Sequence, residues 1–363
     1  MKEKQKLLIT MFSSAGSVAG QGVGSAYEEQ VNLVREGAPE IFDVEINKWT
    51  SEPDIQHFHT IDPAFLLRMK NKKAVNIAYC HFLPDTLEDS LRIPKAFYPL
   101  AESYIIHFYD SADQLVVVNP SFIKDLERFH IDPNKITYIP NYVSKERFHR
   151  LGQEDRHEWR SRYGLKDDDF VILGCGQVQT RKGVQDFVKT AQMLPEAKFV
   201  WAGGFSFGAL TEGYDELKAI MDNPPENVIF TGIIERESMV HIYNMTDVLF
   251  IPSFNELFPM TILEAVNLGI PLVTRDLELY RDILFDSYQH AQDNEGFLAL
   301  LESLLKDKDQ YAYWSKKSDE LAQFYSKEHV LDMWKKFYVE AWEKKFGQTF
   351  EPSQKGISDG NEQ

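Results

Sequence analysis

Cysteine is scarce in this sequence, and long apolar runs are absent. The 363 residues include two cysteines, Cys80 and Cys175, which lie 95 positions apart in runs typical of buried strands. This excludes a disulfide framework and a CxxC metal pair. No window approaches about 18 consecutive apolar residues, so no membrane span is expected, although the chain can still rest on a membrane surface. The apolar stretch at residues 7–12 is too short for a signal peptide, and we expect a protein of the reducing cytoplasm.

Basic charge is also in short supply. The chain holds 39 Lys and Arg against 56 Asp and Glu, a net charge of -17, which argues against nucleic acid as a partner. The deficit is uneven, because residues 1–150 hold 17 basic and 20 acidic groups whereas the remainder holds 22 and 36. The N-terminal part is therefore the one suited to approach an anionic surface. A hydrophobic content of 43% is ample for two packed cores and excludes a disordered protein.

Short apolar runs alternate with helical segments along the whole chain. In the first half the runs lie at residues 7–12, 43–47, 54–60, 74–80, 114–119 and 136–140, and in the second at 170–175, 198–204, 227–233, 247–253 and 270–276. This rhythm predicts an α/β protein with two doubly wound, Rossmann-like parallel sheets that face a cleft.

The polar stretch near residues 150–168 marks the predicted domain boundary. We expect an N-terminal, acceptor-binding domain over residues 1–155 and a C-terminal, nucleotide-sugar-binding domain over 165–325. Residues 326–346 predict a helix whose apolar residues recur at three-and-four spacing, as in core packing. We expect this helix to cross back onto the N-terminal domain. The tail, residues 347–363, has little apolar content and is predicted to be disordered.

Two glutamates follow the strand predicted at 247–253. In open parallel sheets the ligand lies beyond the carboxyl ends of the strands. Glu256 and Glu264 are spaced to accept hydrogen bonds from different hydroxyls of one ligand, such as a sugar nucleotide. Thr261 and the amides beside it begin a predicted helix, where the helix dipole favours a phosphate. Spacing alone leaves open the alternative that Glu264 pairs locally and Glu256 is solvated.

Two loops after predicted strands are candidates for contact with phosphates. The loop at 176–183 ends in Arg181 and Lys182, which can neutralise a diphosphate leaving group; the alternative is a solvated basic loop. Gly20, Gly22 and Gly24 precede a helix predicted to begin near Ser25, and they allow close backbone approach to a ligand. Tyr27 occupies the third glycine position of a GxGxxG motif, so a dinucleotide site is disfavoured.

Three histidines belong to neighbouring predicted strands. His81 directly follows the strand at 74–80, and a lone histidine in that position is most often structural. His57 and His59 form an HxH pattern, but no third ligand is spaced to complete a zinc site. We interpret both as strand residues near the cleft and expect no metal.

The segment SFNELFPMTILEAVNLGIPLV resembles the E-x7-E signature of retaining family-four glycosyltransferases of the GT-B fold, and the likeness extends over roughly residues 5–345. The resemblance implies that Glu256 contacts the donor sugar and that Glu264 holds the ribose of the nucleotide. The segment differs from many members in having Leu257 and Pro259 where they have glycine, and Pro259 has no amide hydrogen to offer the donor. We expect the nucleotide-sugar site to include Phe258, Pro259, Met260 and Thr261.

The same resemblance assigns roles to the other candidates. It implies that Arg181 and Lys182 contact the diphosphate and that His81 lies against the donor sugar and the reaction centre. The glycine loop with Gly22 and Gly24 would close over the donor phosphates beside the acceptor. Asn119-Pro120-Ser121 and Ile139-Pro140-Asn141 also resemble family landmarks at strand ends.

The implied reaction moves a hexose from UDP-glucose or UDP-galactose with retention at the anomeric carbon. Members are thought to react on the front face of the sugar, and the leaving phosphate itself helps to remove the acceptor proton. A double displacement would need a carboxylate nucleophile beneath the anomeric carbon, and no residue identifies itself as one. We expect no tightly bound cofactor and no metal.

The acceptor is indicated by residues 63–109. A basic group, Arg68, Lys70, Lys72 and Lys73, precedes an amphipathic stretch with Arg92 and Lys95, which suits an enzyme at an anionic membrane surface. The alternative is that the apolar side chains of this stretch form the core of a helix; they are Phe97, Tyr98, Leu100, Tyr104 and Ile105.

The order and spacing of residues 81–121 resemble the Gram-positive bacterial members that extend monoglucosyl-diacylglycerol to a diglycosyl lipid. This implies a glycolipid acceptor and a place in the cytoplasm or at the inner face of the membrane. The alternatives are a surface polysaccharide or glycoprotein acceptor and, in another class, a non-catalytic GT-B partner subunit. A nucleotide-sugar epimerase is disfavoured, because it lacks the paired E-x7-E and K-G motifs.

Overall fold

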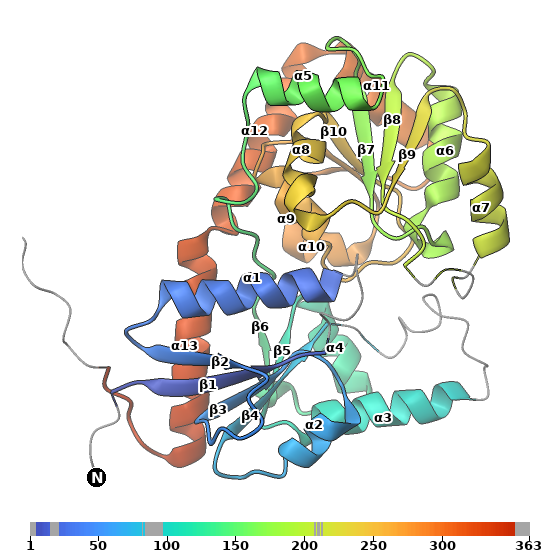
Figure 1. Cartoon of the computed structure of the whole chain (residues 1–363). Helices are drawn as coiled ribbons and strands as arrows, with labels where there is room; N and C mark the ends of the chain where they lie inside the picture. Colours follow the sequence, from blue (N-terminus) through green and yellow to red (C-terminus); the bar gives the residue numbers. More distant parts are fainter. Residues whose placement is uncertain are drawn as a thin grey trace, which may run out of the picture.

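Two parallel sheets of six strands each form the centre of the molecule (Figure 1). The computed structural model describes residues 5–14, 22–81, 83, 97–206, 208, 211 and 213–352. Gly20, Arg92 and Lys95 lie outside these residues. The predicted fold class, with two doubly wound parallel sheets, is confirmed. No helix among the described residues is long and apolar enough to cross a membrane.

The first half of the chain builds one sheet and its helices. The strands are β1 (Leu7–Phe12), β2 (Phe42–Ile46), β3 (Ile55–Phe58), β4 (Val75–Cys80), β5 (Gln114–Val117) and β6 (Ile136–Tyr138). The helices are α1 (Gly22–Gly37), α2 (Pro63–Arg68), α3 (Tyr98–Ser111), α4 (Ser121–Arg128) and the 3-10 helix η4 (Pro133–Lys135).

The second half builds the other sheet. Its strands are β7 (Val171–Cys175), β8 (Lys198–Ala202), β9 (Val228–Gly232), β10 (Val248–Ile251), β11 (Leu272–Arg275) and β12 (Gln289–Ala291). Its helices are α5 (Gln153–Arg162), α6 (Val184–Met193), α7 (Tyr214–Asp222), α8 (Met239–Asn244), α9 (Met260–Val266), α10 (Glu278–Leu284), α11 (Asn294–Lys306) and α12 (Lys308–Phe324), with 3-10 helices η5 (Thr180–Lys182) and η7 (Arg236–Ser238). The last helix, α13 (Lys327–Phe346), packs on the first half.

Burial on both faces explains why the strands are apolar without alternation. In β7, Val171 and Leu173 belong to one hydrophobic core, while Ile172 belongs to another on the opposite face of the sheet. A strand covered on both sides has no solvent face for polar residues. The sequence missed β12, because this edge strand has three residues, of which His290 is exposed.

The strand order places one topological switch point in each sheet. The orders are β2-β1-β3-β4-β5-β6 and β12-β11-β10-β7-β8-β9. The connections therefore diverge between β1 and β3 in the first sheet and between β7 and β10 in the second. A crevice forms at such a point beyond the carboxyl ends of the strands, which is where the loops carrying the predicted site residues begin.

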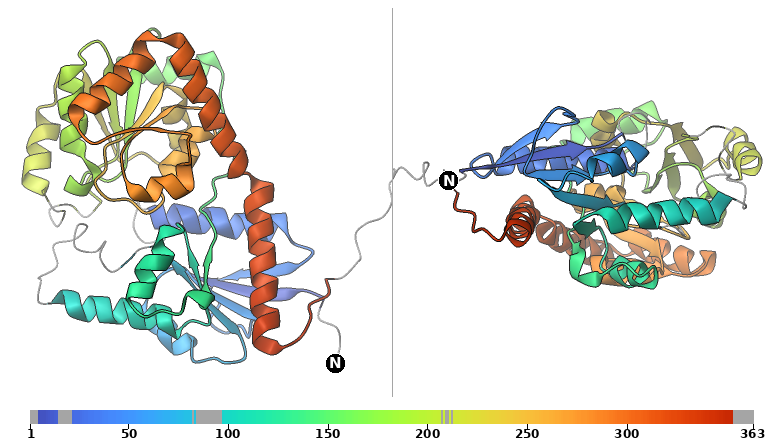
Figure 2. Two further views of the ribbon diagram at one scale, coloured as in Figure 1. Left: turned by 180° about the vertical axis from the view of Figure 1, so that it is seen from behind. Right: turned by 90° about the horizontal axis from the view of Figure 1, so that it is seen from below.

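Two helices connect the halves. The helix α1 lies on the side of the first sheet that faces the second (Figure 1), and it contacts α9. The helix α13 runs back along the first sheet (Figure 2) and contacts α1 and β4. The predicted crossing back is therefore confirmed. Its stripe is buried core as expected, with Trp334 at 1% and Tyr338 at 0% exposed.

Three details differ from the sequence analysis. The helix α1 begins at Gly22 and not near Ser25, because burial of its apolar face outweighs the low helix propensity of glycine. The helix α5 packs on α8 and so joins the second half of the molecule. The tail prediction fails at Phe350, which is 7% exposed and packs against Trp342; residues 353–363 lie outside the described residues.

Candidate active site between the two sheets

A cavity of about 340 Å³ lies where loops from both sheets meet. Its walls come from loops that follow strands of both sheets and from the first turns of α1 and α9. The predicted residues that line it are His81, Arg181, Lys182, Glu256, Phe258, Pro259, Met260, Thr261 and Glu264. Residues more than 180 positions apart in the sequence are thus brought to one space.

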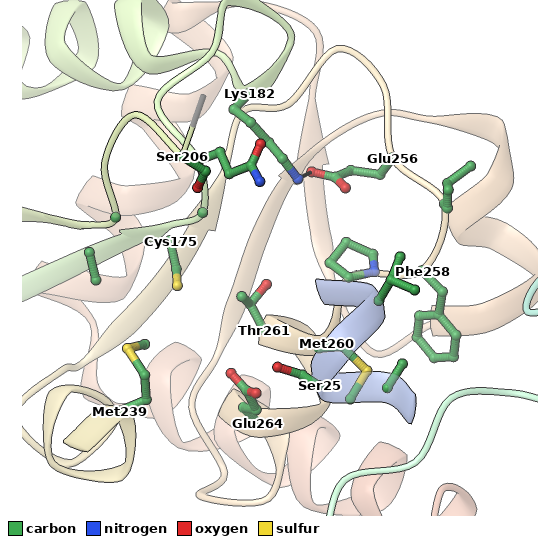
Figure 3. A pocket seen from close by; sticks show the side chains of 18 of the residues that line it. Ser25, Cys175, Lys182, Ser206, Met239, Glu256, Phe258, Met260, Thr261 and Glu264 are labelled. Carbon is green, nitrogen blue, oxygen red and sulfur yellow. Dashed lines mark hydrogen bonds and ion pairs between the residues drawn. The ribbon is translucent and has the colours of Figure 1, made fainter. Parts of the chain in front are cut away.

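Lys182 and Glu256 form an ion pair inside this cavity (Figure 3). The Lys182 Nζ donates to Glu256 Oε1 at 2.5 Å, and Glu256 is only 6% exposed. The alternative of a solvated Glu256 is therefore wrong. Burial alone would raise the pKa of Glu256, but the charges of Lys182 and Arg181 outweigh it, so the pKa lies below its usual value and the carboxylate stays ionised.

Arg181 connects the loop after β7 to the loop after β10. Its Nη1 donates to the Asn255 carbonyl at 3.3 Å, and its own carbonyl accepts from the Phe254 amide at 2.8 Å. Gly183 then has φ +70°, and a Cβ there would lie 2.3 Å from the Pro252 carbonyl oxygen. Only glycine permits this approach, so the adjacent cations are held beside Glu256.

Glu264 has a hydrogen-bond donor at each of its carboxylate oxygens on the opposite wall. Its Oε2 accepts from the Tyr243 hydroxyl at 2.6 Å, and its Oε1 accepts from Arg236 at 2.7 Å. Glu264 is thus paired, but with residues of α8 and η7 that lie 21 and 28 positions away and not with local ones, and it also lines the cavity. Figure 3 shows Glu264 near Thr261 and Met239, on another side of the cavity from the Lys182–Glu256 pair.

Arg236 is a charged lining residue that the sequence analysis missed. It lines the cavity from η7, and its second amino group, Nη2, donates to Glu29 Oε1 of α1 at 2.8 Å. The carboxylates of Glu264 and Glu29 raise the pKa of Arg236 in spite of burial, which opposes its charge. Its position after β9 was a usable signal, since ligand sites follow strands, but nothing in the sequence identified its partners.

His81 lines the cavity at the end of β4 as a neutral imidazole. It is 5% exposed, and burial lowers the pKa of His81 to about 3. Its ring packs at 4.1 Å from the ring of Tyr79 and at 5.8 Å from that of His59. His57 lies in β3 and His59 directly follows it, and they are 0% and 1% exposed. Neither is among the described residues that line the cavity, so their place near the cleft stays an interpretation.

The glycines of the first loop are placed differently from the prediction. Gly22 and Gly24 lie in the first turn of α1, and the described lining residues from this helix are Val23, Ser25 and Ala26. Close backbone approach is found instead between the loops after β7 and β8. Gly203 has φ +145°, and a Cβ there would lie 1.9 Å from the Gly176 carbonyl oxygen.

Two asparagines at strand ends join the first sheet to the loop before α9. Asn119 Nδ2 donates to the Leu257 carbonyl at 3.3 Å, and Asn141 Nδ2 donates to the Phe258 carbonyl at 3.1 Å. Both asparagines are at least nine-tenths buried. The predicted landmarks therefore hold the loop that carries Glu256 against the N-terminal sheet.

The segment expected to meet a membrane divides into two parts. Ile105 is 1% exposed and belongs to the core, whereas Phe97 and Leu100 are 58% and 70% exposed at the start of α3. Ile105 therefore belongs to the helix core, as the second alternative predicts, whereas contact of the exposed Phe97 and Leu100 with a membrane stays a prediction. Arg68 is occupied by the carbonyls of Trp49 and Ser51, so it is a structural cation.

Among the described residues, no group of three or more His, Cys, Asp or Glu side chains is arranged to hold a metal ion. Cys175 lines the cavity as a free cysteine, and burial raises the pKa of its thiol to about 12. The polar groups of the cavity therefore include cations, carboxylates, hydroxyls, amides and a neutral imidazole, which suit a ligand that carries both phosphates and hydroxyls.

Comparison with known proteins gives two family matches, one in each half of the chain. The model for glycosyl transferases group 1 matches residues 155–321, and that for glycosyltransferase family 4 matches residues 39–147. The chain is 45% identical over 344 residues to the alpha-galactosylglucosyldiacylglycerol synthase of Streptococcus pneumoniae, with 93% of this chain and 90% of that protein covered. It is 24% identical over 267 residues to the processive diacylglycerol alpha-glucosyltransferase of Acholeplasma laidlawii, with 72% and 79% covered.

Solved structures show the same architecture at much lower identity. The sucrose-phosphate synthase of Thermosynechococcus elongatus has a TM-score of 0.76 at 16% identity, with 93% of this chain and 100% of that chain covered. The Anabaena protein HepE in complex with UDP-glucose has a TM-score of 0.73 at 12% identity, with 92% and 100% covered. These likenesses concern the fold alone.

Proposed function

Because this chain belongs to the family-four glycosyltransferases of the GT-B fold, we propose that it transfers a hexose, glucose or galactose, from a UDP-sugar to a glycolipid with retention at the anomeric carbon. The acceptor is a glycosylated diacylglycerol such as monoglucosyl-diacylglycerol. The names of the two sequence relatives, both enzymes of diacylglycerol glycosylation, support the acceptor class.

The observation that carries the proposal is the arrangement of charges around the cavity. The Lys182–Glu256 pair and Arg181 lie on one side, and Glu264 lies on another. Under the proposal the diphosphate binds at the two cations and the ribose hydroxyls donate to Glu264. A carboxylate has about four lone-pair sites, so Glu264 can accept from a ribose in addition to Arg236 and Tyr243.

Donor binding would exchange the partners of the buried pair. The diphosphate oxygens take the place of the Glu256 carboxylate at Lys182, since a phosphate carries more charge and more acceptor atoms. Glu256 then accepts hydrogen bonds from the sugar hydroxyls. The ligand-free pair keeps both groups charged and in position, which lowers the reorganisation that the reaction requires.

In the chemical step the bond between the anomeric carbon and the phosphate oxygen breaks. The acceptor hydroxyl forms the new bond on the same face of the sugar and passes its proton to the leaving phosphate. Arg181 and Lys182 stabilise the charge that develops on the diphosphate. His81 is a neutral imidazole against the sugar, so it adds no positive charge to that of the oxocarbenium-like centre.

We further propose that the protein works at the inner face of the cytoplasmic membrane, through the N-terminal half. The exposed side chains of Phe97 and Leu100 on α3 and Leu67 on α2 form the apolar part of this surface. The two helices are neighbours, because the Tyr104 hydroxyl donates to the Ile61 carbonyl just before α2. Lys70, Lys72 and Lys73, which follow α2, are exposed and add positive charge.

The test is UDP release by the purified protein. UDP-glucose, UDP-galactose and UDP-N-acetylglucosamine are each offered with and without monoglucosyl-diacylglycerol in anionic micelles. We expect lipid-dependent release from one donor and its loss in Lys182→Ala, with activity kept in Lys316→Ala, a matched change at a lysine that is 78% exposed. The anomeric configuration of the product, measured by NMR, tests retention.

Other outcomes separate the alternatives. UDP binding without lipid-dependent turnover would contradict the glycolipid acceptor and favour a glycan, a glycoprotein or a non-catalytic role. Absence of UDP binding would overturn the assignment of the cavity.

A further inference from the structure

Arg236 joins the two halves of the molecule through a single planar group. Its Nη1 donates to Glu264 Oε1 at 2.7 Å in the second half, and its Nη2 donates to Glu29 Oε1 at 2.8 Å in the first. The guanidinium also lies 5.3 Å from the ring centre of the fully buried Phe148. Both amino groups of Arg236 donate hydrogen bonds and the guanidinium packs against an aromatic ring, and together these contacts set the orientation of the side chain.

Both carboxylates depend on this cation. Glu29 and Glu264 are each 3% exposed, and a buried carboxylate that loses its partner is strongly unfavourable. Glu29 has further partners on its own side of the cleft, since Arg147 donates to Oε1 at 3.2 Å and the Ser144 amide donates to Oε2 at 3.0 Å. These contacts fix the position of the Glu29 carboxylate on α1, and we call this carboxylate the anchor.

The anchor matters because α1 forms a wall of the cavity. Val23 and Ser25 of its first turn line the space, whereas Glu29 itself does not. A rotation that opened the cleft would pull the Arg236 guanidinium away from either Glu29 or Glu264. The position of the α1 wall and the orientation of Glu264 are thus linked through one side chain.

We infer that Arg236 is a positioning residue that couples nucleotide binding at Glu264 to the placement of α1 through Glu29. The inference rests on the proposed function, in which Glu264 holds the ribose. When the ribose is bound, Glu264 and Arg236 are held together, and Arg236 keeps α1 over the cavity. The reverse also follows, because linkage between two sites is reciprocal.

The experiment measures UDP affinity by calorimetry in wild type, Arg236→Gln, Arg236→Lys, Glu29→Gln and the Arg236→Gln/Glu29→Gln double variant. We expect UDP affinity to fall about tenfold or more in Arg236→Gln and about threefold in Glu29→Gln, the range typical of couplings between contacting groups. The double variant should bind no more weakly than Arg236→Gln. Arg236→Lys should lie between wild type and Arg236→Gln, since one ammonium cannot serve both carboxylates with the same geometry.

The matched control is Arg147→Gln. Arg147 also pairs with Glu29, but it does not line the cavity and its side chain is 36% exposed. In Arg147→Gln the Glu29 carboxylate keeps its bonds from Arg236 and the Ser144 amide, so we expect the UDP affinity of this variant to equal that of wild type. The response of UDP affinity to Glu29→Gln is the informative readout, because a purely structural role would lower the melting temperature and leave affinity unchanged.

The failures are distinguishable. Wild-type protein that binds no UDP would overturn the proposed function. UDP binding in wild type with equal affinity in Glu29→Gln and Arg236→Gln, or with losses that simply add in the double variant, would overturn the coupling alone. If Arg236→Gln fails to fold, Glu29→Gln still decides between these outcomes. This variant keeps the shape of the side chain and removes the charge that pairs with Arg236 Nη2.

Discussion

At the residue scale, the charges of the cavity are defined by their partners more than by their positions in the sequence. Glu256 is ionised because Lys182 and Arg181 lie beside it, and Glu264 is oriented by Tyr243 and Arg236. A buried ion pair contributes little net stability by itself, but removal of one partner leaves a costly unpaired charge.

Glu256→Gln should therefore destabilise the ligand-free protein as well as reduce turnover. We expect a loss of about 3 kcal/mol in the free energy of unfolding near pH 7, because Lys182 is left buried without its counter-ion. The pKa of Glu256 is lowered in the folded state, so its contribution is present above the ordinary carboxyl range and is lost as the pH falls below about 4.5. Urea unfolding at several pH values tests this.

The control is Glu320→Gln, which removes an exposed partner of Lys316, with side chains 46% and 78% exposed. Surface pairs of this kind contribute about 0–1 kcal/mol. An equal loss in the two variants, or a loss in Glu256→Gln that persists unchanged at pH 3, would contradict the prediction.

The three buried histidines predict a dependence of stability on pH. Burial holds the pKa of His57, His59 and His81 below the usual value, so the unfolded chain binds protons that the folded chain does not. The free energy of unfolding is therefore highest above about pH 6.5. Below that pH it decreases by about 1.4 kcal/mol per pH unit for each histidine. His59→Asn should remove about 2 kcal/mol of the loss between pH 6.5 and 5 in urea unfolding. A variant with the same pH slope as wild type would show that His59 is protonated in the folded state.

At the scale of elements, the site is made by the ends of strands and not by the strands themselves. The loops after β7, β8, β9 and β10 all contribute to the cavity, and their close approach depends on glycines at positive φ. Gly203 is the tightest of these positions, since its backbone lies against the Gly176 carbonyl.

Gly203→Ala should abolish UDP binding while the protein still folds. The added Cβ would lie 1.9 Å from the Gly176 oxygen, so the loops after β7 and β8 must separate. The control is Gly164→Ala, where φ is +70° and nothing lies within 4 Å of the added Cβ. Gly164→Ala therefore measures only the free-energy cost of placing an alanine at positive φ, about 1 kcal/mol. If calorimetry still detects UDP binding in Gly203→Ala, the loops after β7 and β8 can separate without loss of the binding site.

The exposed apolar side chains at the start of α3 allow a test of membrane binding. We expect Phe97→Ser and Leu100→Ser, alone or together, to reduce cosedimentation with phosphatidylglycerol vesicles several-fold, because each removes apolar area that would insert in the interface. Tyr313→Ser is the control, since Tyr313 is 51% exposed on α12 in the other half of the molecule. Equal binding of all variants would exclude α3 from the membrane surface.

At the scale of the whole molecule, the two halves differ in net charge. The net charge of -17 is concentrated in the C-terminal half, which an anionic surface repels. The near-neutral N-terminal half, with its exposed apolar groups at α2 and α3, is the part that can approach such a surface.

Salt should separate the electrostatic and apolar parts of vesicle binding. Screening shortens the Debye length from about 10 Å at 0.1 M to about 3 Å at 1 M, which weakens both the attraction of the exposed lysines and the repulsion of the acidic half. We expect binding of wild type to change modestly with salt, and binding of Phe97→Ser/Leu100→Ser to disappear at 1 M. Complete loss of wild-type binding at high salt would show that charge alone holds the protein to vesicles.

The sequence by itself determined the architecture and several of the charged residues that line the cavity. Eleven apolar runs predicted eleven of the twelve strands that the structure describes, because most strands of a sheet covered on both faces are rich in apolar residues. The rule that ligands lie beyond strand ends then selected Arg181, Lys182, Glu256, Glu264 and His81, all of which line one cavity.

Only the tertiary structure decided which charges pair and which helices form the walls. Arg236 and Glu29 are 207 positions apart, and nothing in the local sequence of either marks the other as its partner. The start of α1 at Gly22 and the division of α3 into buried and exposed parts depend in the same way on packing. Strand burial leaves a run of apolar residues in the sequence, whereas a contact between distant side chains depends on the relative placement of two domains.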